Sequence, residues 1–559
     1  MNKIFKMAAA LALPAVIALN LAACQNISAD EFGAEDLKNI IGYIFPATGT
    51  TAMPEDVTAP PETLTGVVTR TSTAEDMTTA ADTPTTEPVT QPNTEPTRVD
   101  YSSFPELPAR FRSVEMPEYI SFSEERKEAI RLMDRLPEKD FEGREYKILT
   151  YSPPIFTPVA DDNRVNEARY YRNALVEKQF NVNISSVTIS DDSLFRTLER
   201  AINTGEHFAD LMSIPMSLQY NLMINGMLMN LDKMPFMNLN APYYNESLMK
   251  AASAGLPTYQ FTSDFTSDYD EYRLIIYNKD IITELSLEDP YTYFKNGTWT
   301  MDRLLEYSKA AVRDVNGNNA YNDGDRVGLT LNTTDDDAYN MFMNAAGINY
   351  YVCFPEELPS MNYFYDRTEA LFDMMKQFWN NGDKLAVYSN TDASMRNSMF
   401  FEYKALFHVA PAGYIKELPS EVMNFGLLPL PKLEAGQTKY STYTFNEEMS
   451  ASIPNNPPNS EFTGIVTEAL CAGSYAHIRT EYLSDMMLHH LRNYNSVDVL
   501  RTVIDNASYD FAQLGASNAT VYNASTGLVK SMVTGNGNFK TLYDRQYTTV
   551  TNYLTRNFK

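Results

Sequence analysis

An alternation of strand-like and helix-like segments between residues 146 and 215 restricts the fold more than any other feature of this sequence. Three short apolar runs, "YKILTY", "VNISSVTIS" and "ADLMSIP", are separated by helical stretches from Val165 to Phe180 and from Asp191 to Gly205. The second stretch places four apolar residues on one helical face: Leu194, Phe195, Leu198 and Ile202. Strand, helix, strand, helix, strand predicts a parallel α/β sheet, in which ligands bind beyond the carboxyl ends of the strands.

Later segments extend this pattern to a second sheet. Buried-type strands are expected at Tyr272–Asn278, "YKALFHVAP" and "MNFGLLPLP", and helices at "FTGIVTEALCAGSYAHI" and "TEYLSDMMLHHL". About 440 residues follow residue 115, too many for one small domain, so we expect two lobes.

The N-terminus indicates export. Lys3 and Lys6 precede an apolar run that ends in "LAAC", which predicts a signal peptide over residues 1–23. The small residues before Cys24 resemble the lipobox of bacterial lipoproteins, in which this cysteine carries the lipid anchor (palmitate among its acyl chains) and becomes the mature N-terminus. Ordinary cleavage beside an incidental cysteine is the alternative. No other span approaches the roughly 20 apolar residues of a membrane helix, so we expect the rest of the chain outside the membrane.

Residues 24–115 are predicted to form a disordered tether. From Ala47 to Asp100 the chain has seventeen threonines, several prolines and no aromatic residue, so it cannot bury enough apolar surface to offset the entropy of ordering. A glycosylated Thr/Pro stalk is the alternative. The formal charge of the chain, −27, argues against nucleic acid or anionic lipid as partner. Cys353 and Cys471 could pair in an oxidising space, but two lone cysteines make no disulfide framework.

Several motifs, in order, resemble one family. "YNKDI", "NGTWTMDRLLEYSKAAVRD" and an Asn/Asp loop closing on "VGL" are followed by "YKALFHVAPAGYIKEL", "NFGLLPLPKLEAGQTKYST" and "YLSDMMLHHLRNYNSVDVLRTVIDNASYDFAQLG". Together they resemble the extracellular solute-binding lipoproteins of bacterial ABC importers, in the carbohydrate-type branch that includes maltodextrin-binding proteins. The match spans about residues 144–515.

The resemblance implies a two-lobe periplasmic-binding-protein-like α/β fold with hinge-crossing strands. Lobe one is expected over residues 116–277 plus about 443–490, and lobe two over 278–442 plus about 491–559. It also implies a function: an extracytoplasmic monomer, anchored by lipid on Cys24, captures a sugar (an oligosaccharide is the first expectation) and delivers it to the transmembrane subunits of an ABC permease. The alternatives are a surface-anchored glycan-acting enzyme, or a glycan receptor or sensor.

Strand ends and the family's motif order select the candidate ligand-binding residues. In lobe one they follow strands: Tyr151, Ser152, Ser213 and Pro215. In lobe two, "TTDDDAY" and the turn after "LFHV" correspond in order to cleft segments of maltodextrin-type proteins, although this turn has Ala410, Pro411 and Ala412 before its first aromatic. The lobe-two candidates are Trp299, Asp336, Tyr339, Pro411 and Tyr414, although a Trp before a helix cap is more often a packing anchor than a ligand contact. Tyr443, in the hinge approach where lobe one resumes, is a further candidate.

The segment "DVNGNNAYNDGD" has the spacing of a twelve-residue calcium loop. Oxygen donors fall at sites 1, 3, 5, 7, 9 and 12, which are Asp314, Asn316, Asn318, the Ala320 carbonyl, Asn322 and Asp325. Two positions depart from the pattern: Asn319 stands at the glycine site, and the last ligand is Asp in place of Glu. We expect a structural Ca²⁺ here; a self-satisfied polar turn is the alternative.

Catalytic motifs are missing from the sequence. None of the five histidines lies in an HExxH arrangement, "AGSYA" is not a nucleophile elbow, and there is no P-loop or GxGxxG. We therefore expect neither an enzyme nor a catalytic cofactor, although two carboxylates for glycoside hydrolysis need only be close in space.

Overall fold

A computed structural model describes residues 133–557, except 134, 159–162, 189–190, 254–256, 319–323, 355–356, 364, 380–385, 388–392, 419–422, 445–447, 456, 492 and 536. The expected signal peptide, the lipidated Cys24, the tether and residues 116–132 of lobe one lie outside the described residues, as do Ala320 and Asn322 of the loop.

Lobe one is built on a four-stranded sheet with the strand order β12-β3-β1-β2. Its strands are β1 (Arg144–Thr150), β2 (Val182–Val187), β3 (Leu211–Pro215) and β12 (Met449–Ser452). β1 pairs in parallel with both β2 and β3, whereas β12 runs antiparallel to β3. The parallel sheet predicted from the strand–helix alternation is confirmed. The helices of this lobe are α4 (Pro153–Phe156), α5 (Arg164–Phe180), α6 (Asp191–Thr204), α7 (Met216–Ile224), η3 (Leu231–Lys233), α8 (Glu246–Ser253) and α15 (Ser460–Asp485).

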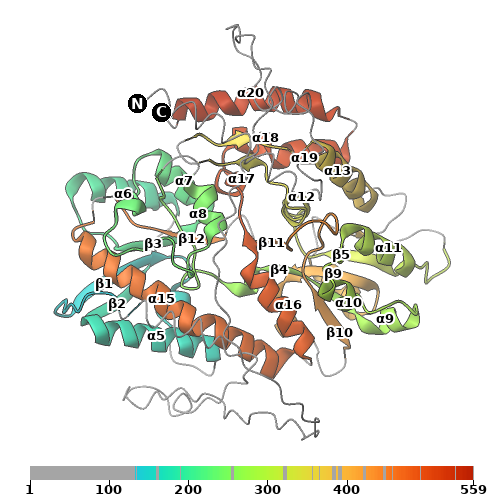
Figure 1. Cartoon of the computed structure of the whole chain (residues 1–559), viewed down its shortest axis with the longest axis horizontal. Coiled ribbons are helices and arrows are strands. Elements are labelled where there is room, and N and C mark those ends of the chain that lie inside the picture. The colour runs from blue at the N-terminus through green and yellow to red at the C-terminus, as the bar shows by residue number, and fades with distance from the viewer. Residues whose placement is uncertain are drawn as a thin grey trace, which may run out of the picture. The chain divides into compact units, whose positions relative to one another are not determined.

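Alternate residues of β1 and β3 are buried on opposite faces of this sheet, whereas β2, at its edge, has only Val182 buried. Ile148 and Leu211 belong to an apolar cluster with residues of α5 and α15, whereas Leu149 and Met212 belong to a cluster with residues of α6, α7 and α8. Figure 1 shows the corresponding layers, with α5 and α15 along one side of the sheet and α6, α7 and α8 along the other. Because side chains alternate between the faces of a strand, a sheet covered on both sides needs central strands with apolar residues on both faces, as in β1 and β3.

Lobe two contains a five-stranded sheet with the order β10-β4-β9-β5-β8. β4 pairs antiparallel with β9 and β10, and β5 pairs in parallel with β9 and β8. The strands are β4 (Arg273–Asn278), β5 (Val327–Leu331), β8 (Ala386–Val387), β9 (Ala405–Pro411) and β10 (Phe425–Leu428). The expected boundary of lobe one at residue 277 included β4 in that lobe, but the pairing places β4 in lobe two, because both of its neighbours, β9 and β10, belong to the lobe-two sheet.

Helices and a short hairpin surround the lobe-two sheet. The helices are α9 (Lys279–Glu284), α10 (Tyr291–Lys295), α11 (Met301–Ala311), α12 (Asp335–Ala345), α13 (Tyr365–Trp379), α14 (Ala393–Phe401), η5 (Ala412–Glu417) and α16 (Tyr494–Asp505). The hairpin is formed by β6 (Tyr351–Val352) and β7 (Ser360–Met361).

The chain passes between the two sheets three times. The first crossing, residues 264–272, contains η4 (Tyr269–Glu271) and leads into β4. The second crossing leads from β11 (Thr442–Tyr443) to β12, and the third from α15 through the π-helical turn η6 (Met486–His490) into α16. β11 pairs with β13 (Ala507–Ser508), which follows α16.

The C-terminal helices touch both lobes. They are α17 (Phe511–Leu514), α18 (Ala519–Ala524), α19 (Thr526–Thr534) and α20 (Phe539–Asn557). α17 packs on α7 and α8 of lobe one, whereas α19 packs on α12 and α13 of lobe two. The Phe511 ring lies 5.8 Å from the Tyr220 ring of α7 and 5.2 Å from the Tyr351 ring of β6. This single aromatic side chain therefore contacts both lobes.

Cys353 and Cys471 are free thiols in the structure. Cys471 is buried in α15, where it accepts a hydrogen bond from the Ser263 hydroxyl, and Cys353 is half-buried in lobe two. Among the helices of the described residues, none is both long and apolar enough to span a bilayer.

Candidate functional site

In each sheet the carboxyl ends of parallel strands lie beside a crossing segment. Pro215, the last residue of β3, pairs with Met449, the first residue of β12 after the second crossing. Arg273, the first residue of β4 after the first crossing, pairs with Pro411, the last residue of β9. Because β1 is parallel to β3 and β5 is parallel to β9, their carboxyl ends lie on these same edges. We call this pair of edges the front edge; it is where α/β sheets bind ligands.

The lobe-one candidates differ in how far they reach the front edge. Tyr151 and Ser152 follow β1 and are half-buried, and the Ser152 N–H donates to Thr150 Oγ1 at 3.0 Å. Ser213 and Pro215 are buried within β3. Ser213 lies between its strand neighbours on β1 and β12 and has no exposed surface, so it belongs to the sheet interior in this conformation.

Two lobe-two candidates lie in the apolar core, which corrects their assignment as ligand contacts. Trp299 is fully buried; its indole N–H donates to the Pro429 carbonyl at 3.0 Å, and its ring packs against Phe407. Tyr339 is fully buried against the Trp379 ring. An aromatic side chain surrounded by core residues cannot offer its face to a solute, so both act as packing anchors.

The other lobe-two candidates lie nearer the front edge. Asp336 is half-buried and accepts hydrogen bonds from the Tyr522 hydroxyl at 2.7 Å and from Lys530 Nζ at 3.1 Å. Pro411 is half-buried at the end of β9, and Tyr414 is buried beside the His408 ring, with ring centroids 5.0 Å apart. The Asp336 carboxylate is therefore already paired, and Pro411 is the more accessible member of the turn.

Tyr443 is fully buried, and its hydroxyl belongs to a polar group that sequence reasoning missed. Its hydroxyl donates to Asp337 Oδ1 at 3.1 Å, and Asp337 Oδ2 accepts from the Thr334 hydroxyl at 2.8 Å. Burial raises the pKa of Asp337, while these two hydrogen bonds and the charge of Arg273 oppose the rise. Burial lowers the pKa of Arg273, which Glu271 and Asp337 oppose. A tyrosine, two carboxyl groups and a guanidinium thus gather where the first crossing enters lobe two.

A second missed group lies at the lobe-one end of the crossings. Glu448, directly before β12, is 7% exposed, and Tyr509 donates its hydroxyl to Glu448 Oε1 at 2.9 Å. Burial raises the pKa of Glu448 to about 8, and the charges of Asp268 and Glu271 add to the rise. Of these groups, Asp268 and Glu271 had a local signal, the acidic run "SDYDEYR" that leads into a buried strand. Carboxyl groups held at such pKa values can donate as well as accept hydrogen bonds near neutral pH.

The described part of the predicted calcium loop is folded on itself. Asp314 Oδ1 accepts from the Gly317 N–H at 2.6 Å, and Asn316 Oδ1 accepts from the Asn318 N–H at 3.0 Å. The buried Asp325 returns to the start of the loop, where its Oδ1 accepts from the Val315 N–H at 2.9 Å. No group of three or more His, Cys, Asp or Glu side chains within the described residues is arranged to hold a metal ion. Of the predicted ligand set, four members are described.

Comparison with known proteins gives structural neighbours only. No protein-family model matches the chain, and no curated protein matches it. One solved structure that it resembles is the galacto-N-biose/lacto-N-biose I-binding protein of the ABC transporter from Bifidobacterium longum: identity is 14%, the match covers 75% of this chain and 99% of that one, and the TM-score is 0.49. Another is the cyclic α-maltosyl-1,6-maltose binding protein from Arthrobacter globiformis, with 12% identity, coverage of 74% and 100%, and a TM-score of 0.48.

A third neighbour is a cyclo/maltodextrin-binding protein complexed with maltotetraose, with 15% identity, coverage of 74% and 98%, and a TM-score of 0.47. These proteins are of the kind that the sequence motifs resemble. The sugar that each binds is a property of that protein.

Proposed function

We propose that this chain is a binding protein that captures a sugar, an oligosaccharide first among the candidates, at the front edge between its two lobes. The observation that carries the proposal is that a strand of each sheet ends beside a segment that crosses between the lobes: β3 beside the second crossing, and β9 beside the first. Segments that connect two lobes act as hinges, so movement about them opens and closes the front edge around a solute.

The chemistry of the front edge supports a hydroxylated ligand. Sugars are held by aromatic surfaces together with a few fixed groups that donate and accept hydrogen bonds. Tyrosine hydroxyls, carboxyl groups and a guanidinium are held in fixed positions beside the front edge, all of them buried in this conformation: Asp337, Tyr443, Arg273, Glu448 and Tyr509. The excess of carboxyl groups over guanidinium groups disfavours anionic sugars, because like charges would be brought together on closure.

Location and partners form part of the same proposal. A lipid on Cys24 holds the chain to the outer side of the cell membrane, and the tether gives the lobes reach. The lobes act as a monomer and deliver the solute to the transmembrane subunits of an ABC permease. A structural Ca²⁺ held by the loop from Asp314 to Asp325 would stabilise lobe two, without a part in chemistry.

A glycan-acting enzyme is the second candidate, and one observation favours it. Buried carboxyl groups with raised pKa values, such as Asp337 and Glu448, are frequent in catalytic sites. Binding and catalysis differ in the fate of the sugar: a binding protein returns it unchanged, whereas a hydrolase shortens it.

A panel of neutral oligosaccharides tests both candidates. At least one member is expected to raise the melting temperature and to reduce the radius of gyration, since ligand bound only by the folded, closed form stabilises it. Asp337→Asn is expected to weaken binding by about tenfold, the loss of roughly one charge-assisted hydrogen bond. Tyr494→Phe, an exposed tyrosine on α16, serves as the control.

The bound sugar is then recovered after prolonged incubation and analysed by mass spectrometry. Unchanged sugar supports transport, and shortened sugar whose formation stops in Asp337→Asn makes the chain an enzyme. A panel without any stabilising member contradicts the assignment of a sugar ligand.

A further inference from the structure

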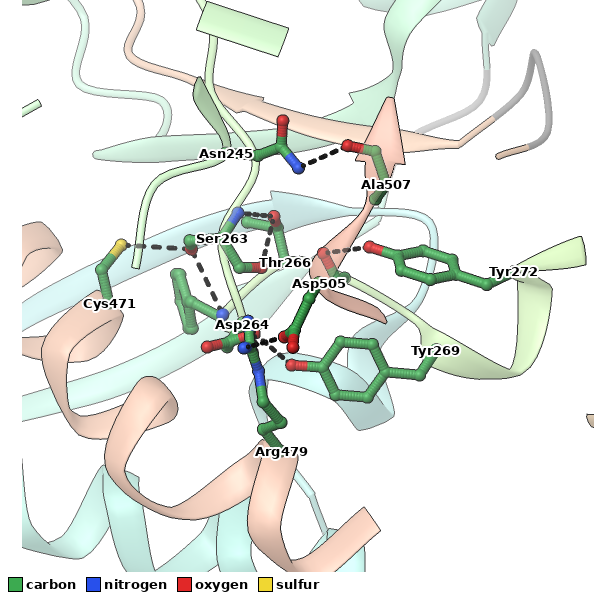
Figure 2. A network of polar contacts seen from close by, with 12 residues as sticks. Asn245, Ser263, Asp264, Thr266, Tyr269, Tyr272, Cys471, Arg479, Asp505 and Ala507 are labelled. Atoms are coloured by element: carbon green, nitrogen blue, oxygen red, sulfur yellow. Dashed lines mark hydrogen bonds and ion pairs between the residues drawn. The ribbon is translucent and has the colours of Figure 1, made fainter. Parts of the chain in front are cut away.

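A cavity of about 180 Å³ lies beside the first crossing, apart from the residues of the front edge. Its lining is polar and aromatic, and includes Tyr244, Asn245, Asp264, Tyr269, Arg479 and Asp505. Figure 2 shows Arg479 extending from α15 between Asp264 and Asp505, with the hydroxyl of Tyr269 directed at Asp264.

The strand order places this cavity on the opposite side of the crossings from the front edge. On the side of β12 away from β3, Phe261 pairs with Ala451, and Tyr244 pairs with Ser263 beyond it. The first crossing starts after Ser263, and the second ends at β12. Both crossings therefore separate the ends of β1 and β3, on one side, from the segment at Tyr244, on the other. In lobe two, α16 packs on β10, on the side of β4 away from β9 and β5. We call this side the back of the hinge.

Groups from both lobes meet across the back of the hinge. Arg479 Nη1, on α15 of lobe one, donates to Asp505 Oδ1, at the end of α16 of lobe two, at 2.8 Å. Asn245 Nδ2, before α8, donates to the Ala507 carbonyl at 3.2 Å. Rotation that closes the front edge about the crossings separates the two sides of the back, so the size of this cavity depends on the angle between the lobes.

The lining selects the chemistry of a ligand. Arg479 also donates to Asp264 Oδ1 through Nη2, at 3.0 Å, so one guanidinium faces two carboxylates and the excess negative charge disfavours anions. Asp264 is 6% exposed, and its other oxygen, Oδ2, has no hydrogen-bond partner within the described residues. The exposed lining is mainly polar, and its carboxylate, guanidinium and hydroxyl groups both accept and donate hydrogen bonds. A small polyol, with hydroxyl groups on a carbon ring, matches this combination.

We propose that the cavity at the back of the hinge is a second binding site, which takes a neutral polyol of the size of one sugar ring. A molecule that contacts Asp264 and Tyr269 on one side and Asp505 on the other favours the lobe angle at which these groups stand at their present separations. A ligand at this site therefore shifts the equilibrium between the open and closed arrangements of the lobes. Because the front edge depends on the same equilibrium, binding at one site changes the affinity of the other.

Binding to the full chain is measured by saturation-transfer NMR with D-glucose and myo-inositol as probes, and with ethylammonium and sulfate as charge comparators. At least one of the two polyols is expected to bind, and neither ion. Asp505→Phe fills part of the cavity while leaving Arg479 its pair with Asp264, and is expected to weaken polyol binding by about tenfold or more. Asp498→Asn, which changes an exposed carboxylate on the same helix, is expected to leave binding unchanged.

Two results overturn the proposal. One is binding that survives Asp505→Phe but is lost in Asp337→Asn; the polyol then occupies the front edge, and the proposed function stands without a second site. The other is the absence of polyol binding in the parent chain, or preferential binding of ethylammonium, which assigns the cavity to an organic cation. Melting curves of each variant establish that the lobes are folded.

Coupling to the lobe angle has its own readout. Spin labels at Glu199→Cys on α6 and Asp373→Cys on α13, both exposed, report the distance between lobes in a chain with Cys24→Ser and Cys353→Ser. Saturating polyol is expected to narrow the distance distribution, and Asp505→Phe is expected to remove the narrowing. A distribution unaffected by bound polyol contradicts the coupling.

Discussion

Replacement of Glu448 by glutamine is expected to stabilise the protein, increasingly so as the pH rises. The Glu448 carboxyl has a pKa of about 8 in the folded chain and an ordinary value of 4.5. Between these values only the folded chain holds the proton, so each rise of one pH unit lowers the free energy of unfolding by about 1.4 kcal/mol. By pH 7 the accumulated loss is roughly 3 kcal/mol, and it is complete only above pH 8. Glutamine does not ionise and retains an oxygen that accepts from Tyr509, so Glu448→Gln removes this loss.

Urea unfolding of the parent and of Glu448→Gln at a series of pH values measures the effect. The two free energies of unfolding should nearly agree at about pH 5 and diverge by roughly 3 kcal/mol at pH 7, with the variant the more stable. Glu206→Gln, at an exposed glutamate of lobe one, should show no such divergence. If Glu448→Gln is instead less stable by a constant amount across the series, the carboxyl is ionised throughout and the reasoning from burial fails.

Three further predictions concern other parts of the chain. Chelation should lower the melting temperature and added Ca²⁺ restore it, with Asp314→Ala removing the difference; identical curves would favour the polar turn. Trp299→Ala should lower the free energy of unfolding by about 3–5 kcal/mol without changing sugar affinity in the folded protein, because the indole is a core group; weaker affinity at unchanged stability would return Trp299 to the ligand site. Cys24→Ala should abolish labelling with a radioactive fatty acid while melting of the lobes is unaffected, and equal label on both proteins would remove the lipid anchor.

Much of the fold was predictable because its central strands are buried on both faces. The apolar runs of β1 and β3 and the β-branched residues of β2, separated by helical segments, led directly to these strands, and the parallel pairing followed from the connections. The place of β12 was not predictable in the same way. No local pattern specifies that Met449–Ser452 pairs with a strand more than two hundred residues earlier. Nor does a local pattern specify the lobe of β4, which depends on the strands that it pairs with.

The candidate site was predicted less well, because helix rotation decides which side chain faces the hinge. Asp337 and Tyr339 are two positions apart on α12, and two positions turn a helix by about 200°. Asp337 therefore meets Tyr443 at the crossing, whereas Tyr339 enters the core against Trp379. Glu448 gave no local signal, since an acidic residue in "NEEMS" looks like an ordinary surface charge until β12 is paired.

The discontinuity of lobe one has a consequence for biosynthesis. All five strands of the lobe-two sheet come from residues 273–428, whereas the lobe-one sheet is complete only when β12, at residues 449–452, pairs with β3. α15, which covers one of its faces, comes later still. During synthesis or export, lobe two can therefore complete its sheet before lobe one does. Until β12 has been made, one edge of β3 has no pairing strand. Pairing over so long an intervening segment is slow, because the entropy of loop closure is lost before the stabilising contacts between the strands can form. Lobe one is then the segment most exposed to aggregation, and the one for which a chaperone outside the cytoplasm would matter most.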